Sequence, residues 1–569
     1  MSGAASEALS RIASNYWEGV LRRNPTLATF FGDARYHDRL PDVGPDGREA
    51  ERLALRDVQR SLSDVAEEEL DVEERISVGM LRLAAEQGLA ALPYRLDEMA
   101  VDQMSGPQVW LPELLNWHPL DSSEHVDQLI ARFRAFPAYM EQYLTNLQDG
   151  VRDGRTATRM ATERVIGQLR SLLETTPVDS ALAAPAAASL HARRDANQAW
   201  MMPASQAEQL LAAVERAVYP AYQQMLEFLQ GEYLNEHARR DHGVWSVHDG
   251  EQIYGLLCRQ HTTTALTPAE LHQIGLTELE YIQNEMRAIM ARLGDASGDV
   301  RAFTEGLVKA PDNLSSSRDE IVVSAERLLE AAQAALPKTF GRLPAIPCQV
   351  KPIEEYRERD SVAAFYYPPS GDGGRPGIFY VNTYDPASRP KHTLPALTFH
   401  EAVPGHHLQI AIATETHGLP DFRRLGSDVT AYVEGWALYT ERLAGELGLY
   451  PDDKARFGML GYQAWRACRL VVDTGMHYLH WTRQQGIDFF LENVGLTERE
   501  TVNEVDRYII WPGQALSYKI GQREIESLRR ETAERLGDRF DLRSFHDELL
   551  AHGAVPLSTL RETIERWPG

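Results

Sequence analysis

The chain contains little cysteine and few basic residues for its length. Its 569 residues include three cysteines, Cys258, Cys348 and Cys468. They lie too far apart for a disulfide framework or a cysteine-type zinc site, so we expect a reducing compartment, the cytoplasm. Lysine and arginine number 58 against 83 aspartate and glutamate, a net charge of −25. This acidity argues against nucleic-acid binding and against docking on anionic lipid.

Long apolar runs are also missing from the sequence. No uncharged apolar segment approaches the ~18–20 residues that a membrane span needs, and the N-terminal residues lack the pattern of a signal peptide. We therefore expect no membrane partner. Hydrophobic residues still make up 43% of the chain, enough for a large core. Because a single core rarely grows beyond about 250–300 residues, we expect two lobes.

Helical periodicity dominates the chain. Apolar residues recur at three- and four-residue spacing, as in REAERLALRDVQRSLSDVAEEEL. The pattern predicts a mainly α-helical protein with an N-terminal lobe over 1–240 and a second lobe over 241–569, packed closely together. TPAE at 267–270 has the form of a capping box at a helix start. Helical periodicity covers residues 47–93, 124–150, 157–175, 205–232, 267–294, 318–336, 427–447, 453–486 and 520–536.

One region, residues 345–384, breaks the helical rhythm. AAFYY and GIFYVN are short, aromatic and β-branched, and the turn residues PPSGDGGRPG separate them. This pattern predicts a β-hairpin within a small sheet. Its edge strand offers a place for an extended peptide to pair, although a purely structural ribbon explains the pattern as well.

The stretch that follows the hairpin carries the most chemistry. HEAVPGHH places His400, Glu401, His406 and His407 on an apolar background. In H-E-x-x-H metallohydrolases, two imidazoles hold Zn²⁺ and the glutamate acts as general base. Here Pro404 occupies the usual position of the second histidine. The pattern therefore predicts a metal site with an altered spacing.

The altered spacing requires a break in the helix. In a straight helix neither His406 nor His407 can share a metal with His400, because one points away and the other lies ~10.5 Å along the axis. Pro404 removes a backbone donor and Gly405 relaxes the chain, so this pair can open a bulge or kink. We favour His406 as the second ligand and keep His407 as the alternative.

A third ligand is expected from another helix. The segment SDVTAYVEGWALYTE carries Glu434 and Glu441 one heptad apart. A carboxylate some two dozen residues after the histidines suits a His₂Glu zinc site. Glu434 follows an apolar run, where a buried carboxylate needs a metal or a partner. Glu441 is a candidate acceptor for an imidazole N–H.

Several long motifs resemble the bacterial DUF885 family. They are NPTLATFFGDARYHDRLPD, RQHTTTALTPAELHQIGL, HEAVPGHHLQ, YVEGWALYTERLA, RACRLVVDTGMHYLHWT and WPGQALSYKIGQREI, and they span nearly the whole chain. The family in turn looks like a distant relative of helical gluzincin peptidases, including the thimet oligopeptidase and carboxypeptidase Taq groups. This resemblance implies a mostly helical fold with a small sheet beside a deep cleft.

The resemblance also implies roles for individual residues. His400, His406 and Glu434 would hold Zn²⁺ or another divalent transition metal, and Glu401 would be general base and then proton donor. The motif of dipeptidyl peptidase III carries one extra residue before its Gly-His pair. Here two extra residues precede Gly405 and His406, so this analogy again favours His406 as the second ligand. By order and role, Tyr518 matches the residue that stabilises the oxyanion in such enzymes. The alternative interpretation is that Tyr518 only packs with Leu516 and Ile520.

Arg469, Asp473 and His477 recur on one helical face at four-residue spacing. We interpret them first as an ion-pair ladder within the helix. The functional alternative makes Arg469 a clamp for a substrate carboxylate and Asp473 a carboxylate that orients a metal-bound histidine.

The residues thus predict a zinc-dependent hydrolase of peptide or peptide-like amide bonds in small substrates, as a carboxypeptidase, dipeptidase or oligopeptidase. The alternative is a non-catalytic helical binding protein with a degenerate metal site. A di-iron carboxylate bundle is disfavoured, since none of the 18 histidines follows a glutamate by three residues. The sequence does not indicate an oligomeric state.

Overall fold

The computed structural model of the chain describes residues 3–191, 200–354, 358–371, 373–426, 429–494 and 497–569. These residues form two compact units. The first comprises Met1–Glu69 and Leu81–Ile253, and the second comprises Leu70–Met80 and Tyr254–Gly569. The division near residue 253 falls later than the expected boundary at 240, and the second unit also takes a short segment from the N-terminal part. The fold is mainly α-helical, as the periodicity predicts.

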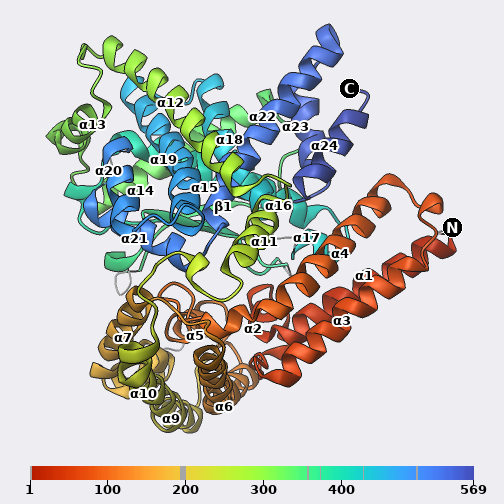
Figure 1. The fold of residues 1–569 in the computed structure, drawn as a ribbon, viewed down its shortest axis with the longest axis vertical. Helices are drawn as coiled ribbons and strands as arrows, with labels where there is room; N and C mark the ends of the chain where they lie inside the picture. Colours follow the sequence, from red (N-terminus) through yellow and green to blue (C-terminus); the bar gives the residue numbers. More distant parts are fainter. Residues whose placement is uncertain (1–2, 192–199, 355–357, 372, 427–428, 495–496) are drawn as a thin grey trace. The chain divides into compact units, whose positions relative to one another are not determined.

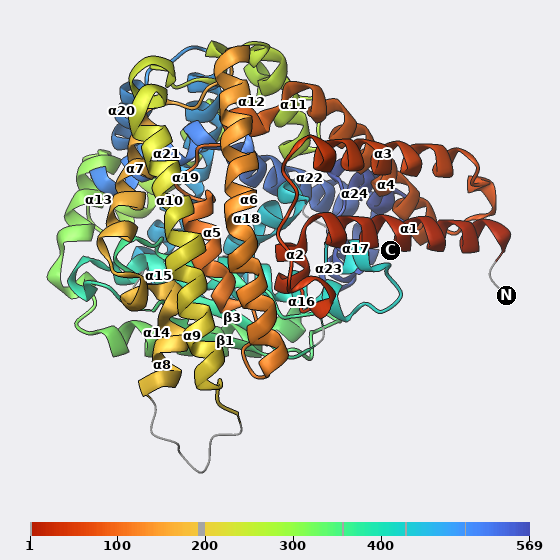
Figure 2. The same cartoon turned by 90° about the horizontal axis from the view of Figure 1, so that it is seen from below.

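The longest helix of the first unit, α6, packs against α9 and α10, whereas α1 packs on α2 and α3 (Figure 2). Phe133, Phe136, Met140, Leu144 and Leu147 are buried on α6 and recur at helical spacing. Helix α9 continues through a π-helical turn into α10, which also packs on α6. The helices are α1 (Ala4–Arg23), α2 (Pro25–Phe30), α3 (Pro45–Ser63), most of α4 (Val72–Ala91), α5 (Pro107–Glu113), α6 (Ser123–Asp153), α7 (Arg159–Glu174), α8 (Ala184–His191), α9 (Ala204–Ala213) and α10 (Tyr219–Phe228).

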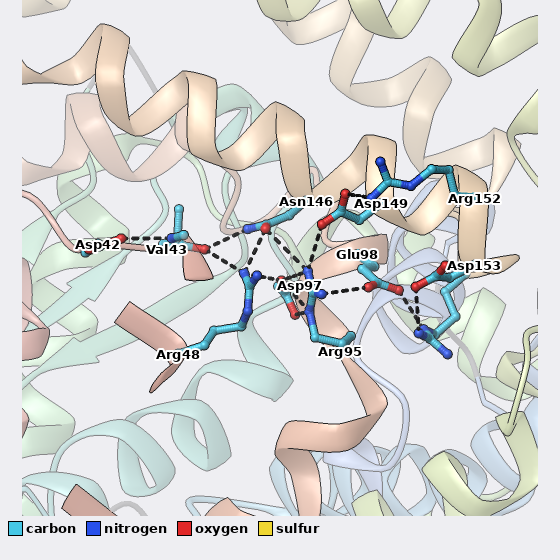
Figure 3. Close-up of polar contacts among 12 residues, drawn as sticks. Asp42, Val43, Arg48, Arg95, Asp97, Glu98, Asn146, Asp149, Arg152 and Asp153 are labelled. Carbon is cyan, nitrogen blue, oxygen red and sulfur yellow. Dashed lines mark hydrogen bonds and ion pairs between the residues drawn. The ribbon is translucent and has the colours of Figure 1, made fainter. Parts of the chain in front are cut away.

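A polar network joins α3 to α6 in this unit (Figure 3). The Arg48 guanidinium donates to the Val43 carbonyl oxygen at 3.1 Å and to Asn146 Oδ1 at 2.8 Å. Arg95 approaches the carboxylate of Glu98 at 3.1 Å. Glu98 is fully buried, so its charge depends on such partners.

The second unit contains the sheet and the remaining helices (Figure 1). Its longest pair, α12 and α19, pack along one another. Helix α12 starts at Pro268 with the predicted capping box of Thr267 and Glu270. The helices are α11 (Gly250–Thr262), which begins in the first unit, α12 (Pro268–Arg292), α13 (Val300–Lys309), α14 (Arg318–Ala335), α15 (Leu394–Glu401), α16 (His406–Glu415), α17 (Asp421–Arg424), α18 (Thr430–Glu446), α19 (Asp453–His477), α20 (Arg483–Asn493), α21 (Glu498–Ile510), α22 (Ser517–Leu536), α23 (Leu542–Ala551) and α24 (Leu557–Arg566).

Two predicted helical stretches are interrupted in the structure. The stretch 47–93 divides into α3 and α4, and 453–486 divides into α19 and α20. In the second case Thr482 and Gln485 form a capping box that starts a new helix. Reciprocal hydrogen bonds between Asp71 and Glu74 mark the start of α4 in the same way. Among the described residues, no helix is both long and apolar enough to span a bilayer.

The sheet has the strand order β1-β3-β2. Strands β2 (Ala364–Tyr367) and β3 (Gly377–Val381) form an antiparallel pair, which confirms the predicted hairpin. Strand β1 (Cys348–Pro352) pairs in parallel with β3. Positions 355–357 and 372 of the predicted β region, and 427–428 of the predicted helix 427–447, lie outside the described residues.

Helices α18 and α22 approach closely because both present a glycine at the contact. A Cβ on Gly435 would meet the Gly521 backbone, and one on Gly521 would overlap the Ala431 carbonyl oxygen. Glu434 and Glu441 lie on α18, and Tyr518 lies on α22. The glycine contact therefore sets the distance between two helices that carry predicted site residues.

We expect Gly521→Ala to destabilise the protein by about 3 kcal/mol, because the added methyl group meets backbone that cannot rotate away. The midpoint of denaturant unfolding measures this change. Gly461→Ala is the matched control, since it lies within α19 and a Cβ there meets nothing within 4 Å. The control should be neutral or slightly stabilising. Equal effects of the two substitutions would contradict the proposed close packing.

Candidate metal centre

The helix that begins at Leu394 is interrupted immediately after the His-Glu pair. Helix α15 ends at Glu401, and α16 begins at His406. A Cβ on Gly405 would overlap the carbonyl oxygens of Phe399 and His400, so only glycine fits there. The Pro404 carbonyl accepts a hydrogen bond from the Trp436 indole of α18 at 2.9 Å. The predicted bulge is thus a complete break, and it absorbs the extra residues of the motif.

This break brings together three of the predicted ligands. His400 Nε2 lies 3.6 Å from Glu434 Oε2, and His406 Nε2 lies 3.5 Å from the same oxygen. The two imidazole rings are nearly perpendicular, with centroids 4.9 Å apart. All three residues thus turn one ligand atom toward a common point.

The distances between these atoms fit a divalent ion better than they fit hydrogen bonds. Ligand atoms bound to a tetrahedral Zn²⁺ at ~2.0–2.2 Å lie ~3.3–3.6 Å from one another. Glu434 Oε2 is buried and makes no hydrogen bond to the described residues. An unpaired buried carboxylate oxygen is costly, and a cation between the three atoms would remove that cost.

Electrostatics keep the carboxylate of Glu434 ionised. Burial opposes its charge, but the imidazoles of His400 and His406 hold the pKa of Glu434 well below its usual range. Burial likewise favours a neutral His400 ring, but Glu434 and Glu441 raise the pKa of His400 to about 9. The centre therefore attracts positive charge.

Glu441 lies behind His400, where the sequence predicts an imidazole acceptor. Its Oε1 lies 2.9 Å from His400 Nδ1. Its Oε2 accepts from Gln463 Nε2 at 3.0 Å, and Lys519 Nζ donates to Gln463 Oε1 at 2.9 Å. Burial lowers the pKa of Lys519 to about 8. This chain of contacts holds the His400 ring with Nε2 toward Glu434. Among the described residues, His406 Nδ1 has no such partner.

Glu401 and Tyr518 lie near the His400 imidazole. Burial raises the pKa of the Glu401 carboxyl, which interacts electrostatically with His400, His406 and Glu434. The Tyr518 ring lies 6.5 Å from the His400 ring and nearly parallel to it. Its hydroxyl has no hydrogen-bond partner among the described residues, so it is available to a ligand.

His407, the alternative ligand, contacts the sheet region instead. Its Nδ1 lies 2.9 Å from the Tyr366 hydroxyl of β2, and its Nε2 lies 3.0 Å from the Ile346 carbonyl oxygen. Burial lowers the pKa of His407 to about 4. A neutral ring that uses both nitrogens in this way ties α16 to the sheet, and the geometry favours His406 as the ligand.

The expected ion-pair ladder on α19 is wrong. Arg469 donates to Glu504 Oε2 at 3.1 Å and to the Tyr508 hydroxyl at 3.0 Å, both on α21. Asp473 accepts from the Tyr254 hydroxyl at 2.6 Å, and burial raises its pKa to about 7. His477 Nε2 lies 2.9 Å from the Tyr508 carbonyl oxygen. Each of these side chains bonds to another helix, because α19 is buried on several sides and its polar groups meet the helices packed against it. Asp473 is therefore engaged away from the three ligand atoms.

Sequence reasoning missed Gln463, Lys519 and Arg466, which lie near the site in the structure. Gln463 and Lys519 support Glu441, as described above. Arg466 lies with its Cζ 5.9 Å from the centre of the Tyr518 ring. Their only signal in the sequence is polarity within an otherwise buried helical face, which does not identify partners on distant segments.

Comparison with known proteins assigns the chain to a family. The family described as "Bacterial protein of unknown function (DUF885)" matches residues 25–564. The chain belongs to this family. No curated protein matches it.

Two solved structures resemble this DUF885 protein over nearly its whole length. A "putative lipoprotein" from Colwellia psychrerythraea is 28% identical, with a TM-score of 0.92 and 99% of both chains covered. A "putative lipoprotein of unknown function" from Shewanella oneidensis is 18% identical, with a TM-score of 0.77, covering 98% of this chain and 100% of the other. The second likeness concerns the fold alone.

Elemental analysis of the purified protein tests the candidate centre. We expect about one divalent metal ion per chain, lost in His400→Ala, His406→Ala and Glu434→Ala, because each substitution removes one of three ligands. His407→Ala is the matched control and should keep the metal. No metal in the wild type after incubation with Zn²⁺, or loss confined to His407→Ala, would contradict this assignment.

Glu441→Gln tests the contact behind His400. We expect metal affinity to fall about 10–100-fold, measured by competition with a chelator, because the neutral amide orients and polarises the imidazole less well. Glu446→Gln is the control on the same helix, since its carboxylate is half exposed and pairs with Arg529. Unchanged affinity in Glu441→Gln would show that Glu441 serves packing alone.

Proposed function

We propose that this DUF885 protein is a metal-dependent hydrolase of peptide or peptide-like amide bonds in small substrates. The observation that carries the proposal is the convergence of His400 Nε2, His406 Nε2 and Glu434 Oε2, with separations of 3.5 and 3.6 Å from the carboxylate oxygen. Two imidazoles and one carboxylate are the ligand set of catalytic zinc sites that leave one position open. We propose Zn²⁺ or another divalent transition metal as the cofactor.

A bound divalent ion supplies Lewis acidity, which polarises a carbonyl and makes coordinated water more acidic. Glu401 follows the ligand His400 directly at the end of α15. In the proposed reaction its carboxylate takes a proton from the attacking water while the water oxygen bonds to the carbonyl carbon. Glu401 then passes that proton to the nitrogen as the C–N bond breaks.

Tyr518 is the proposed donor to the developing oxyanion. The near-parallel ring contact of 6.5 Å with His400 keeps it beside the ligand set. Arg469 stacks on this ring, with its Cζ 4.3 Å from the ring centre, and restricts its position. A donor of this kind contributes about 3–4 kcal/mol to lowering a barrier. Packing against Leu516 and Ile520 is the alternative role, and Tyr518→Phe separates the two because it keeps the ring and removes the hydroxyl.

Glu401→Gln tests the hydrolase directly. We expect the metal content to stay at the wild-type level and the rate of hydrolysis in a short-peptide library to fall about 10²–10⁴-fold, because an amide cannot accept the proton. Glu415→Gln, on the neighbouring helix α16, is the matched control and should keep the rate. Wild-type protein that holds metal but cleaves no peptide would favour the non-catalytic binding protein instead.

A further inference from the structure

Arg466 is a buried cation that forms no ion pair with the described residues. The residue is 6% exposed, and its Nε and Nη1 atoms are buried without a hydrogen bond. Within the described part of the chain it forms no ion pair. Burying a charged group without a partner costs free energy. An anion that binds there would remove this cost.

The neighbouring Arg469 and Arg507 also have one unpaired buried nitrogen each, but unlike Arg466 they pair with a carboxylate. Arg469 and Arg507 both pair with Glu504, at 3.1 and 3.3 Å, and the Tyr508 hydroxyl donates to the same carboxylate at 2.7 Å. The Glu504 carboxylate is therefore already occupied. Arg469, the clamp considered from the sequence, is committed to α21, whereas Arg466 is not.

Aromatic rings hold the Arg466 guanidinium without using its hydrogen-bond donors. Its Cζ lies 4.8 Å from the ring centres of both Tyr462 and Trp465, and 5.9 Å from that of Tyr518. Such contacts offset part of the cost of burying the charge. They offer no acceptor to the N–H groups at its planar edge, which match a carboxylate in a two-point contact.

Two ring contacts connect this guanidinium to the candidate metal centre. The Tyr518 ring centre lies 5.9 Å from Arg466 Cζ and 6.5 Å from the centre of the His400 ring. Arg466 also interacts electrostatically with Glu401. An extended peptide covers ~3.3–3.6 Å per residue. Arg466 Cζ thus lies at most about 12 Å from the centre of the His400 ring, a distance that an extended peptide covers in about four residues.

We infer that Arg466 binds a carboxylate of the substrate and so selects the bond to be cleaved. The inference rests on the proposed function and makes it more specific. The C-terminal carboxylate of a short peptide and an acidic side chain offer the same chemistry. If the C-terminal carboxylate is bound, the reaction releases a short piece from the C-terminus.

Binding to protein that cannot turn over tests this inference without relying on hydrolysis. The probes are three versions of one tripeptide: with a free C-terminus, with an amidated C-terminus, and amidated with a glutamate as its last residue. Calorimetry on metal-loaded Glu401→Gln protein measures their affinities. We expect at least tenfold tighter binding of a carboxylate-bearing peptide than of the plain amide, and the better of the two identifies the source of the carboxylate.

The preference should depend on Arg466. The double variant Glu401→Gln, Arg466→Gln should show no preference for a carboxylate-bearing peptide. The double variant Glu401→Gln, Arg466→Lys should show a weaker preference, because lysine keeps the positive charge but lacks the paired N–H donors of the guanidinium. Arg456→Gln is the matched control on the same helix and should keep the preference, since Arg456 is half exposed. Unfolding midpoints check that each variant folds.

The outcomes separate this inference from the proposed function. Equal affinity for all three peptides, no binding of any of them, or a preference that survives Arg466→Gln overturns the role of Arg466. If the protein binds carboxylate-bearing peptides through Arg466 but cleaves no peptide, the role of Arg466 stands and the proposed hydrolase function is rejected.

Discussion

The absence of a side chain at position 405 is the constraint on which the candidate site depends. The α-carbon of Gly405 lies against the carbonyl oxygens that end α15, where a Cβ has no room. This close approach lets the chain turn and start α16 at once, so that His406 faces His400 although they are six positions apart. In a continuous helix the same spacing directs the two rings away from each other. A pair of glycines, Gly435 and Gly521, lets α18 and α22 approach each other closely in a similar way.

The second unit buries many charged and polar groups, and most of them are neutralised in pairs. Glu441, Gln463 and Lys519 form one chain of contacts behind His400, and Arg469 and Arg507 share Glu504. Such networks are tolerated because each charge in them has a partner of opposite charge or a hydrogen bond. The buried atoms without a hydrogen-bond partner among the described residues include Glu434 Oε2 and two nitrogens of the Arg466 guanidinium. Each of these unpaired buried atoms is a candidate point of contact with a ligand.

The two kinds of unpaired atom are complementary in charge. The carboxylate of Glu434 attracts a cation, and the guanidinium of Arg466 attracts an anion. The Tyr518 ring contacts both the ligand His400 and Arg466. A short peptide carries a polarisable carbonyl and a carboxylate a few residues apart. The carbonyl suits the candidate metal centre, and the carboxylate suits the Arg466 guanidinium. The structural relatives have no stated activity, so the proposed chemistry rests on the residues of this chain.

Much of the fold could be predicted from local patterns, because those patterns act over a few residues. Helical periodicity predicts the mainly α-helical class, TPAE predicts the start of α12, and the aromatic strands predict the hairpin. The interruptions after Ser63 and His477 were missed, because the periodic pattern continues through them and the caps at Asp71 and Thr482 are short polar signals.

For the candidate site, the sequence by itself determined which residue types are available and that Pro404 and Gly405 must break the helix. It did not decide between His406 and His407, because that choice depends on where the sheet lies: Tyr366 and Ile346 engage His407. It also suggested partners for Arg469 and Asp473 along their own helix, whereas the structure supplies them from α21, Tyr254 and Gly513. Tertiary structure decides such pairings because a buried polar group bonds to whatever packing brings within about 3 Å, and that distance bears no relation to separation along the chain.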